Sequence, residues 1–194
     1  VGCGEFLDLI PFADFCKKAG LKIIQLLPVN DTGTESSPYS ALSAFALHPL
    51  YASLEKLTED DKILAKIKKL QKKYKDFERF PYKELRQEKL ALLREIYLSK
   101  KEEAKSSKEI DTWLSQNPWA KEYAVFMHLK DVNNEASYKQ WKCHKNVTAK
   151  KIEELWNDPK TEDEHFFYVW LQYNLAKQFS EAAEYVRSLG IMLK

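Results

Sequence analysis

Apolar residues in the first part of the chain alternate between helical spacing and a short continuous run. A helix is predicted over Asp8–Ala19, because its apolar residues recur at helical spacing and Gly20 follows as a C-terminal cap. Lys22–Leu27 is rich in isoleucine and leucine and is closed by Pro28, which predicts a strand buried on both faces, as parallel strands are. A turn, a helix and a strand in this order form one unit of an α/β architecture.

The alternation of helix and strand stops after this unit, and some ninety residues follow with helical patterns alone. They predict a helical insertion into an α/β fold. A long amphipathic helix comes next, ends at Gly190, and leads from Ile191 into what we predict to be another buried strand. The helices are predicted from a capped start at Thr58–Asp61 to about Tyr74, and over Tyr82–Lys100, Lys108–Gln116, Trp119–Asp131, Thr148–Trp156 and Asp163–Leu189.

The charge balance and the cysteine content indicate which binding partners, which cellular compartment and which kinds of site to expect. The chain has 31 basic and 29 acidic residues among 194, so we expect neither a nucleic acid nor a membrane as its partner. The lysines of Lys62–Lys75 alternate with apolar residues at helical spacing, which favours a solvated helix face over a nucleic-acid patch. Three widely spaced cysteines indicate a reducing, cytoplasmic compartment, and no spacing signals a metal site.

A compact stretch of small hydroxyl and apolar residues, Ser36–Leu54, follows the predicted strand where a short charged loop is usual. Loops that follow strands carry ligands more often than the scaffold does, so this stretch is the candidate site. We interpret Ser43, Phe45 and Pro49 as packing residues of the loop. Asn30 and Asp31 fit either hydrogen bonding to a ligand or ordinary turn chemistry, and a lone His48 fits a packed structural role or a ligand contact.

Five segments together resemble the 4-alpha-glucanotransferases, the amylomaltases or disproportionating enzymes of glycoside hydrolase family 77. The sequence after the first strand, SPYSALSAFALHPLY at Ser37–Tyr51, is the most specific of them. Ser40, Leu47 and His48 depart from the commonest bacterial pattern and look more like the plant-cytosolic type, which often carries starch-binding modules. The other four are GCGEF at Gly2–Phe6, QLLPVNDTG at Gln25–Gly33, EYAVFMHLK at Glu122–Lys130 and QYNLAKQFSEAAEYVRSLGIMLK at Gln172–Lys194.

The resemblance implies an α/β fold, namely the N-terminal part of a (β/α)8 barrel with a largely all-α inserted subdomain. It places the first barrel units in residues 1–57, the insertion in 58–160 and a barrel helix leading into the next strand in 161–194. It also implies transfer of glucosyl or maltodextrin units between alpha-1,4-glucans through two carboxylates about 5 Å apart, without a cofactor. In the relatives these carboxylates come later than this sequence reaches, so we expect no catalytic residue in this chain.

The resemblance places the Asp31–Tyr39 loop on the active face of the barrel, at the carboxyl end of a strand. Sugars need an aromatic plane together with short polar groups, and Tyr39 and Ser37 match family positions that contact the glucan. The alternative for Tyr39 is a buried tyrosine bonded to backbone. For the whole chain, the alternatives are a helical protein-interaction module and a glucan-binding piece without catalytic activity.

Overall fold

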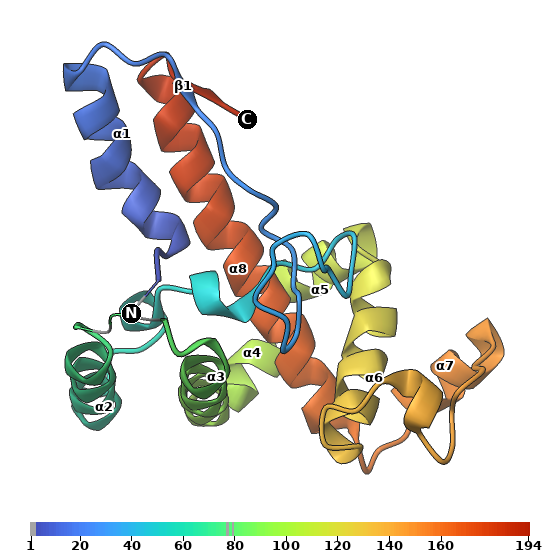
Figure 1. Ribbon diagram of the computed structural model, residues 1–194. Coiled ribbons are helices and arrows are strands. Elements are labelled where there is room, and N and C mark those ends of the chain that lie inside the picture. Colours follow the sequence, from blue (N-terminus) through green and yellow to red (C-terminus); the bar gives the residue numbers. More distant parts are fainter. Residues whose placement is uncertain (1–2, 77, 79) are drawn as a thin grey trace. The chain divides into compact units, whose positions relative to one another are not determined.

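The computed structural model describes residues 3–76, 78 and 80–194, and its elements are labelled in Figure 1. The chain divides into two compact units, one made of Val1–Ser99 and Asn174–Lys194 and the other of Lys100–Tyr173. The long helix α8, Glu162–Ser188, contributes residues to both units. The boundaries predicted after residues 57 and 160 concern a barrel and its insertion, and they stay a prediction.

The first unit contains a small parallel sheet made of β1, Ile23–Ile24, and β2, Met192–Leu193. Hydrogen bonds extend the pairing from Lys22, whose carbonyl accepts from Met192 N, to Leu26, whose N–H donates to the Lys194 carbonyl. The predicted strand was too long, and its predicted burial on both faces is wrong because Ile23 is 57% exposed. A strand is buried on both faces only when neighbours cover them, and β2 is its one sheet neighbour in the described chain.

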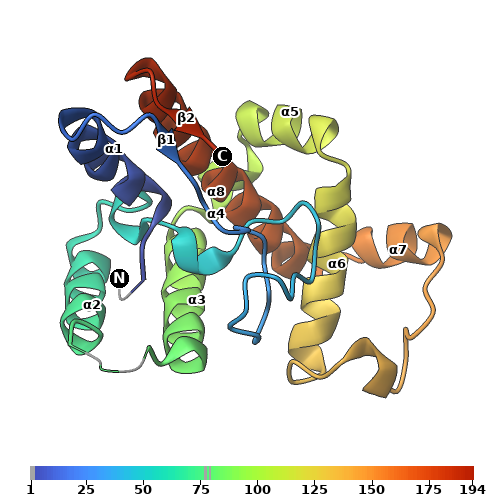
Figure 2. The same ribbon diagram turned by 45° about the horizontal axis from the view of Figure 1, so that its top comes forward.

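Helix α1, Leu9–Lys18, lies beside the C-terminal part of α8, as Figures 1 and 2 both show. The side-chain amine of Lys17 donates to the Leu189 carbonyl at 2.8 Å, and the Tyr185 hydroxyl donates to Asp14 at 2.7 Å. The predicted helix is confirmed within a residue at each end, after a short 3-10 turn, η1, Phe6–Asp8. Its core with the sheet consists of Ala13, Cys16, Ile24, Val186 and Ile191.

Helices α2, Asp61–Lys73, and α3, Tyr82–Ser99, lie side by side in the same unit (Figure 2). The Asp60 carboxylate caps α2 by accepting from the N–H groups of Lys62 and Ile63, which confirms the predicted capped start. Two 3-10 turns that the sequence pattern did not predict precede α2: η2, Pro49–Tyr51, and η3, Leu54–Lys56. The amphipathic interpretation of Lys62–Lys75 is confirmed, because the apolar stripe is buried at Ile63, Ile67 and Leu70.

The secondary-structure elements of the second unit are all helices within its described residues, and the irregular connection over residues 133–148 is interrupted by one 3-10 turn. The side-chain amine of Lys101 contacts Asp163 at 2.8 Å, and the Tyr168 hydroxyl donates to Asp131 at 2.6 Å. No helix in the described part of the chain is long and apolar enough to cross a membrane. The unit contains α4, Lys101–Lys105, α5, Lys108–Gln116, α6, Trp119–Val132, the 3-10 turn η4, Tyr138–Gln140, α7, Ala149–Trp156, and the start of α8.

Candidate functional site

A loop leaves the carboxyl end of β1 and closes on itself, and we call residues 29–48 the β1 loop. Its two ends run antiparallel and are bridged at Asn30 and Leu47. Two hydrogen bonds fasten this base, from Asp31 N to the Ala46 carbonyl at 2.8 Å and from His48 N to the Val29 carbonyl at 3.0 Å. Because the base is a short ladder, the residues between its ends form a closed loop instead of an open connection.

Asp31 organises the interior of the β1 loop. Its side chain is 0% exposed, and its carboxylate accepts a hydrogen bond from Gly33 N at 2.9 Å. The Asp31 carbonyl accepts from Leu42 N at 2.7 Å, which draws the far side of the loop back onto its base. Gly33 has a φ of +61°, a left-handed conformation that glycine adopts without steric cost.

His48 closes the loop and is 2% exposed. Its Nδ1 accepts a hydrogen bond from Leu50 N at 3.1 Å and so caps η2. Because Nδ1 is an acceptor, the ring proton of the neutral imidazole is on Nε2, which therefore donates to the Tyr82 hydroxyl. Burial lowers the pKa of His48 to about 4, more than the neighbouring Asp31 carboxylate raises it, so the ring is neutral near pH 7.

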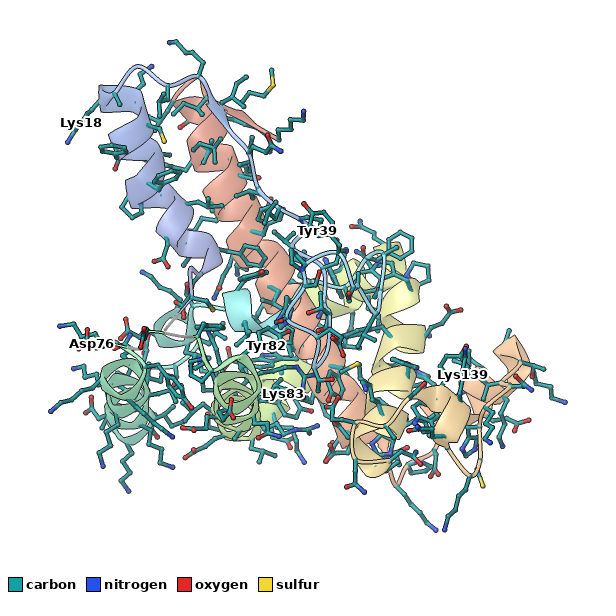
Figure 3. The ribbon with its side chains drawn as sticks, in the orientation of Figure 1. Lys18, Tyr39, Asp76, Tyr82, Lys83 and Lys139 are labelled. Carbon is teal, nitrogen blue, oxygen red and sulfur yellow. The ribbon has the colours of Figure 1, made fainter. Side chains whose placement is uncertain are left out.

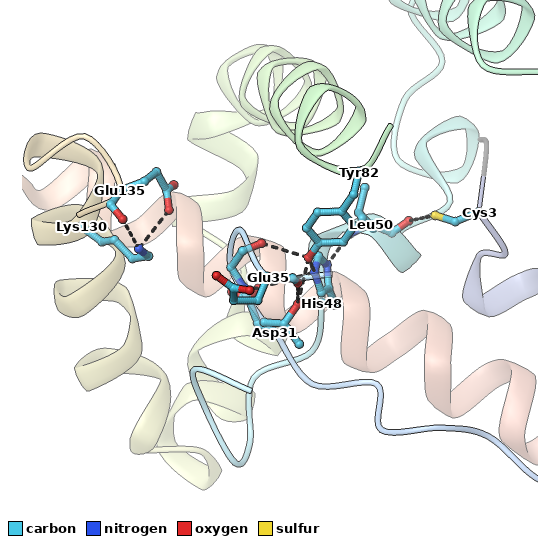
Figure 4. A network of polar contacts seen from close by, with 10 residues as sticks. Cys3, Asp31, Glu35, His48, Leu50, Tyr82, Lys130 and Glu135 are labelled. Carbon is cyan, nitrogen blue, oxygen red and sulfur yellow. Dashed lines mark hydrogen bonds and ion pairs between the residues drawn. The ribbon is translucent and has the colours of Figure 1, made fainter. Parts of the chain in front are cut away.

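Tyr82, the first residue of α3, holds the loop from outside it (Figure 4). Its hydroxyl lies 3.0 Å from the Gly33 carbonyl, to which it donates, and 2.8 Å from the Thr32 hydroxyl. The Thr32 hydroxyl in turn donates to the Glu35 carbonyl at 2.6 Å. Burial raises the pKa of Tyr82 to about 12, so this hydroxyl keeps its proton and remains a donor.

Lys89 lies two turns further along α3 and fastens the end of the candidate stretch. Its buried ammonium donates to the Leu50 carbonyl at 2.7 Å and to the Glu5 carboxylate at 2.6 Å. Burial opposes ionisation of Glu5, but the Lys89 ammonium outweighs this effect and holds the pKa of the carboxyl below its usual range. Two residues of α3, Tyr82 and Lys89, thus fix the β1 loop and the turn that follows it.

The outer part of the β1 loop presents rings to solvent. Tyr39 is 74% exposed and Phe45 is 64% exposed. Tyr39 follows Pro38 in a turn closed by a hydrogen bond from Ser40 N to the Ser37 carbonyl at 3.0 Å. The Ser43 hydroxyl accepts from the N–H groups of Phe45 and Ala46, which fixes the backbone that carries the second ring.

The predicted site residues therefore separate into two groups. Tyr39 and Ser37 are exposed, and the alternative of a buried tyrosine is wrong for Tyr39. Asn30 is half-buried at the base. Asp31 and His48 are buried and hold the loop in place, which favours the turn and packed roles over direct contact with a ligand; ligand contact by either stays a prediction.

The prediction that Phe45 packs within the loop is wrong, because its side chain is exposed. Ser43 and Pro49 have the structural roles predicted for them. Tyr82 and Lys89 carry no signal in the sequence that marks them as partners of the loop. Both lie on one face of a predicted helix, but nothing in the local pattern says which loop that face meets.

No group of three His, Cys, Asp or Glu side chains could hold a metal ion within residues 3–76, 78 and 80–194.

The family model for 4-alpha-glucanotransferases of glycoside hydrolase family 77 matches residues 1–194. The chain belongs to this family. A 4-alpha-glucanotransferase of Oryza sativa subsp. japonica is 35% identical over 207 residues, with 100% of this chain and 21% of the relative covered. A 4-alpha-glucanotransferase of Chlamydia pneumoniae is 33% identical over 201 residues, with 100% of this chain and 37% of the relative covered. The chain therefore spans between about a fifth and two fifths of the length of these relatives.

A solved structure, the amylomaltase from Streptococcus agalactiae in complex with acarbose, is similar in fold. The TM-score is 0.81 at 21% sequence identity, and the match covers 99% of this chain and 39% of that chain. This likeness confirms the predicted fold class, part of a (β/α)8 barrel with inserted helices. Family membership favours the glucanotransferase interpretation over a helical interaction module.

Proposed function

We propose that this chain is part of a 4-alpha-glucanotransferase and that its β1 loop forms one wall of a glucan-binding subsite. The observation that carries the proposal is Tyr39, an exposed ring on a loop that is fastened at its base and from α3. A pyranose offers an apolar C–H face that stacks on such a ring. The exposed Ser37 hydroxyl lies two residues away in the same turn and suits the rim of sugar hydroxyls.

In this proposal the interior residues do not touch the sugar. Asp31, His48 and Tyr82 hold the backbone, so that Tyr39 needs little ordering when a glucan binds. The substrates would be alpha-1,4-glucans such as maltose, maltodextrin, glycogen or starch, and the chemistry a retaining transfer by two carboxylates. We assign neither carboxylate to an acidic residue of this chain. A cytoplasmic location and appended starch-binding modules belong to the same proposal.

The activity is tested with the full-length protein that contains this chain. We expect it to release glucose from maltose when glycogen or maltodextrin is present as acceptor. The measurement is glucose formed over time, with folding checked by circular dichroism. A folded protein without turnover on any alpha-glucan would contradict the proposal.

The role of Tyr39 is tested by Tyr39→Ala in the same protein. Loss of the stacking plane should lower kcat/KM about tenfold or more, which corresponds to about 1.4 kcal/mol of transition-state stabilisation. Tyr39→Phe keeps the ring and should retain most of the activity. Phe12→Ala is the matched control, because Phe12 is an exposed aromatic residue on α1, outside the loop. Equal kcat/KM for Tyr39→Ala and Phe12→Ala would remove Tyr39 from the subsite.

A further inference from the structure

A second surface, in the helical unit, combines an apolar pocket with a run of positive charge. The pocket lies between α6, the segment that follows η4, and the start of α7, and its volume is about 260 Å³. Apolar side chains provide most of its wall, and we call it the α6–α7 pocket. They include Phe126, Leu129, Trp141, Val147 and Ile152.

The volume of the α6–α7 pocket limits what it can hold. Sites for drug-sized ligands are roughly 300–1,000 Å³, so this pocket suits one apolar side chain better than a whole ligand. Trp141 lies beneath it, buried and donating its indole N–H to the Ala136 carbonyl at 3.0 Å. Val147 and Tyr138 are exposed at the surface. The floor is therefore fixed by the core of the unit, and the mouth is open to solvent.

The part of the chain that follows α6 and lines the pocket carries only positive charge. Residues 138–152, which we call the basic segment, contain five lysines and neither aspartate nor glutamate. Lys151 is paired with Glu154 at 3.0 Å. The other four lysines have no carboxylate within 4 Å among the described residues. They are Lys139, which Figure 3 labels, Lys142, Lys145 and Lys150.

Together these features indicate a partner that is apolar at one point and acidic on both sides of it. Lys145 and His144 line the pocket itself, and Glu122 is its one acidic lining residue. A glucan has no net charge, so a run of lysines exerts no long-range electrostatic attraction on it. A duplex nucleic acid offers a regular row of phosphates and no apolar side chain to fill the pocket.

We propose that the α6–α7 pocket and the basic segment bind an acidic segment of a partner protein, whose apolar side chain enters the pocket. The lysines attract the carboxylates and set the association rate, and the buried side chain supplies most of the affinity. This surface shares no residue with the β1 loop.

The test uses the full-length protein and a labelled, glutamate-rich peptide with one central phenylalanine, followed by fluorescence anisotropy. We expect binding that weakens with salt and that falls about tenfold when the phenylalanine of the peptide is replaced by alanine. The double variant Lys142→Glu with Lys145→Glu should weaken binding tenfold or more. The matched control is Lys68→Glu with Lys72→Glu, which makes the same charge change on exposed residues of α2.

Val147→Glu places a carboxylate at the mouth and tests the pocket without touching the lysines; we expect at least a fivefold loss of peptide binding. Each variant is checked for folding by thermal melting. Equal binding of the phenylalanine and alanine peptides, or equal loss in the control pair, would overturn the proposal. Tighter binding of single-stranded RNA, lost in the same lysine variant, would assign the surface to nucleic acid instead.

Discussion

The β1 loop and the basic segment are both long connections, but their interiors are opposite in character. The loop encloses polar groups, and the buried Asp31 carboxylate, His48 imidazole and Thr32 hydroxyl are each hydrogen bonded. The basic segment lies over the apolar cluster of Val125, Leu129 and Trp141, and its lysines are exposed. A polar interior fixes one geometry, because each hydrogen bond is directional. An apolar interior makes no hydrogen bonds to the lysines around it, so these lysines remain available to bind another molecule.

The largest expected loss of stability follows from removing the buried cation at the end of the loop, Lys89. Lys89→Met should cost about 3–5 kcal/mol of unfolding free energy, because it leaves the Glu5 carboxylate partly buried without its cation. Urea unfolding of the full-length protein measures this. Lys145→Met makes the same change in the basic segment, where we expect less than about 0.5 kcal/mol. Similar losses at both positions would remove the contrast between the two regions.

The second prediction concerns the pH dependence of the unfolding free energy, to which His48 contributes. The pKa of His48 is about 4 in the folded protein and 6.5 in its ordinary environment, so the unfolded chain binds the proton more readily. Its contribution to stability is therefore complete above pH 6.5 and is lost as the pH falls towards 4, by about 3 kcal/mol. Unfolding free energy measured at several pH values should show this loss. His48→Asn does not titrate and should flatten the curve in that window; an unchanged slope would contradict the assignment.

Removing one hydroxyl from the loop should have a smaller effect. Tyr82→Phe keeps the ring but takes away the donor to the Gly33 carbonyl and the acceptor for His48, at a cost of about 1–3 kcal/mol. Faster amide hydrogen exchange at Gly33 and Leu42 would show that the loop has loosened. Tyr138→Phe is the control in the basic segment, where the tyrosine is exposed and we expect less than about 0.5 kcal/mol. Unchanged exchange in Tyr82→Phe would mean that the ladder at the base holds the loop unaided.

Much of the fold follows from the sequence, because amphipathic stripes identify helices directly. Every predicted helix has a counterpart in the structure within a few residues, including the long one over Glu162–Ser188. The strand Lys22–Leu27 was predicted too long, since a continuous apolar run does not say how many neighbours will pair with it. The short elements η2, η3, η4 and α4 have too few residues to show a period.

The candidate site was predictable in its position and not in the roles of its residues. Tyr39 and Ser37 follow a strand and belong to a specific motif, which is enough to place them at the surface of the loop. Whether Asp31 and His48 point inward depends on Tyr82 and Lys89, which lie 34 or more residues further along the chain. Such pairings carry no local pattern, so the sequence left both roles open for His48 and gave the exposed Phe45 a packing role that it does not have.

The small parallel sheet of β1 and β2 affects how this chain behaves when it is prepared by itself. Ile23 and Met192 face each other in register, and both side chains are exposed, at 57% and 62%. Parallel strands with an open edge and apolar side chains are templates for pairing with another chain. We therefore expect this chain, when prepared by itself, to associate through that open edge, and a rise in light scattering with concentration would measure it.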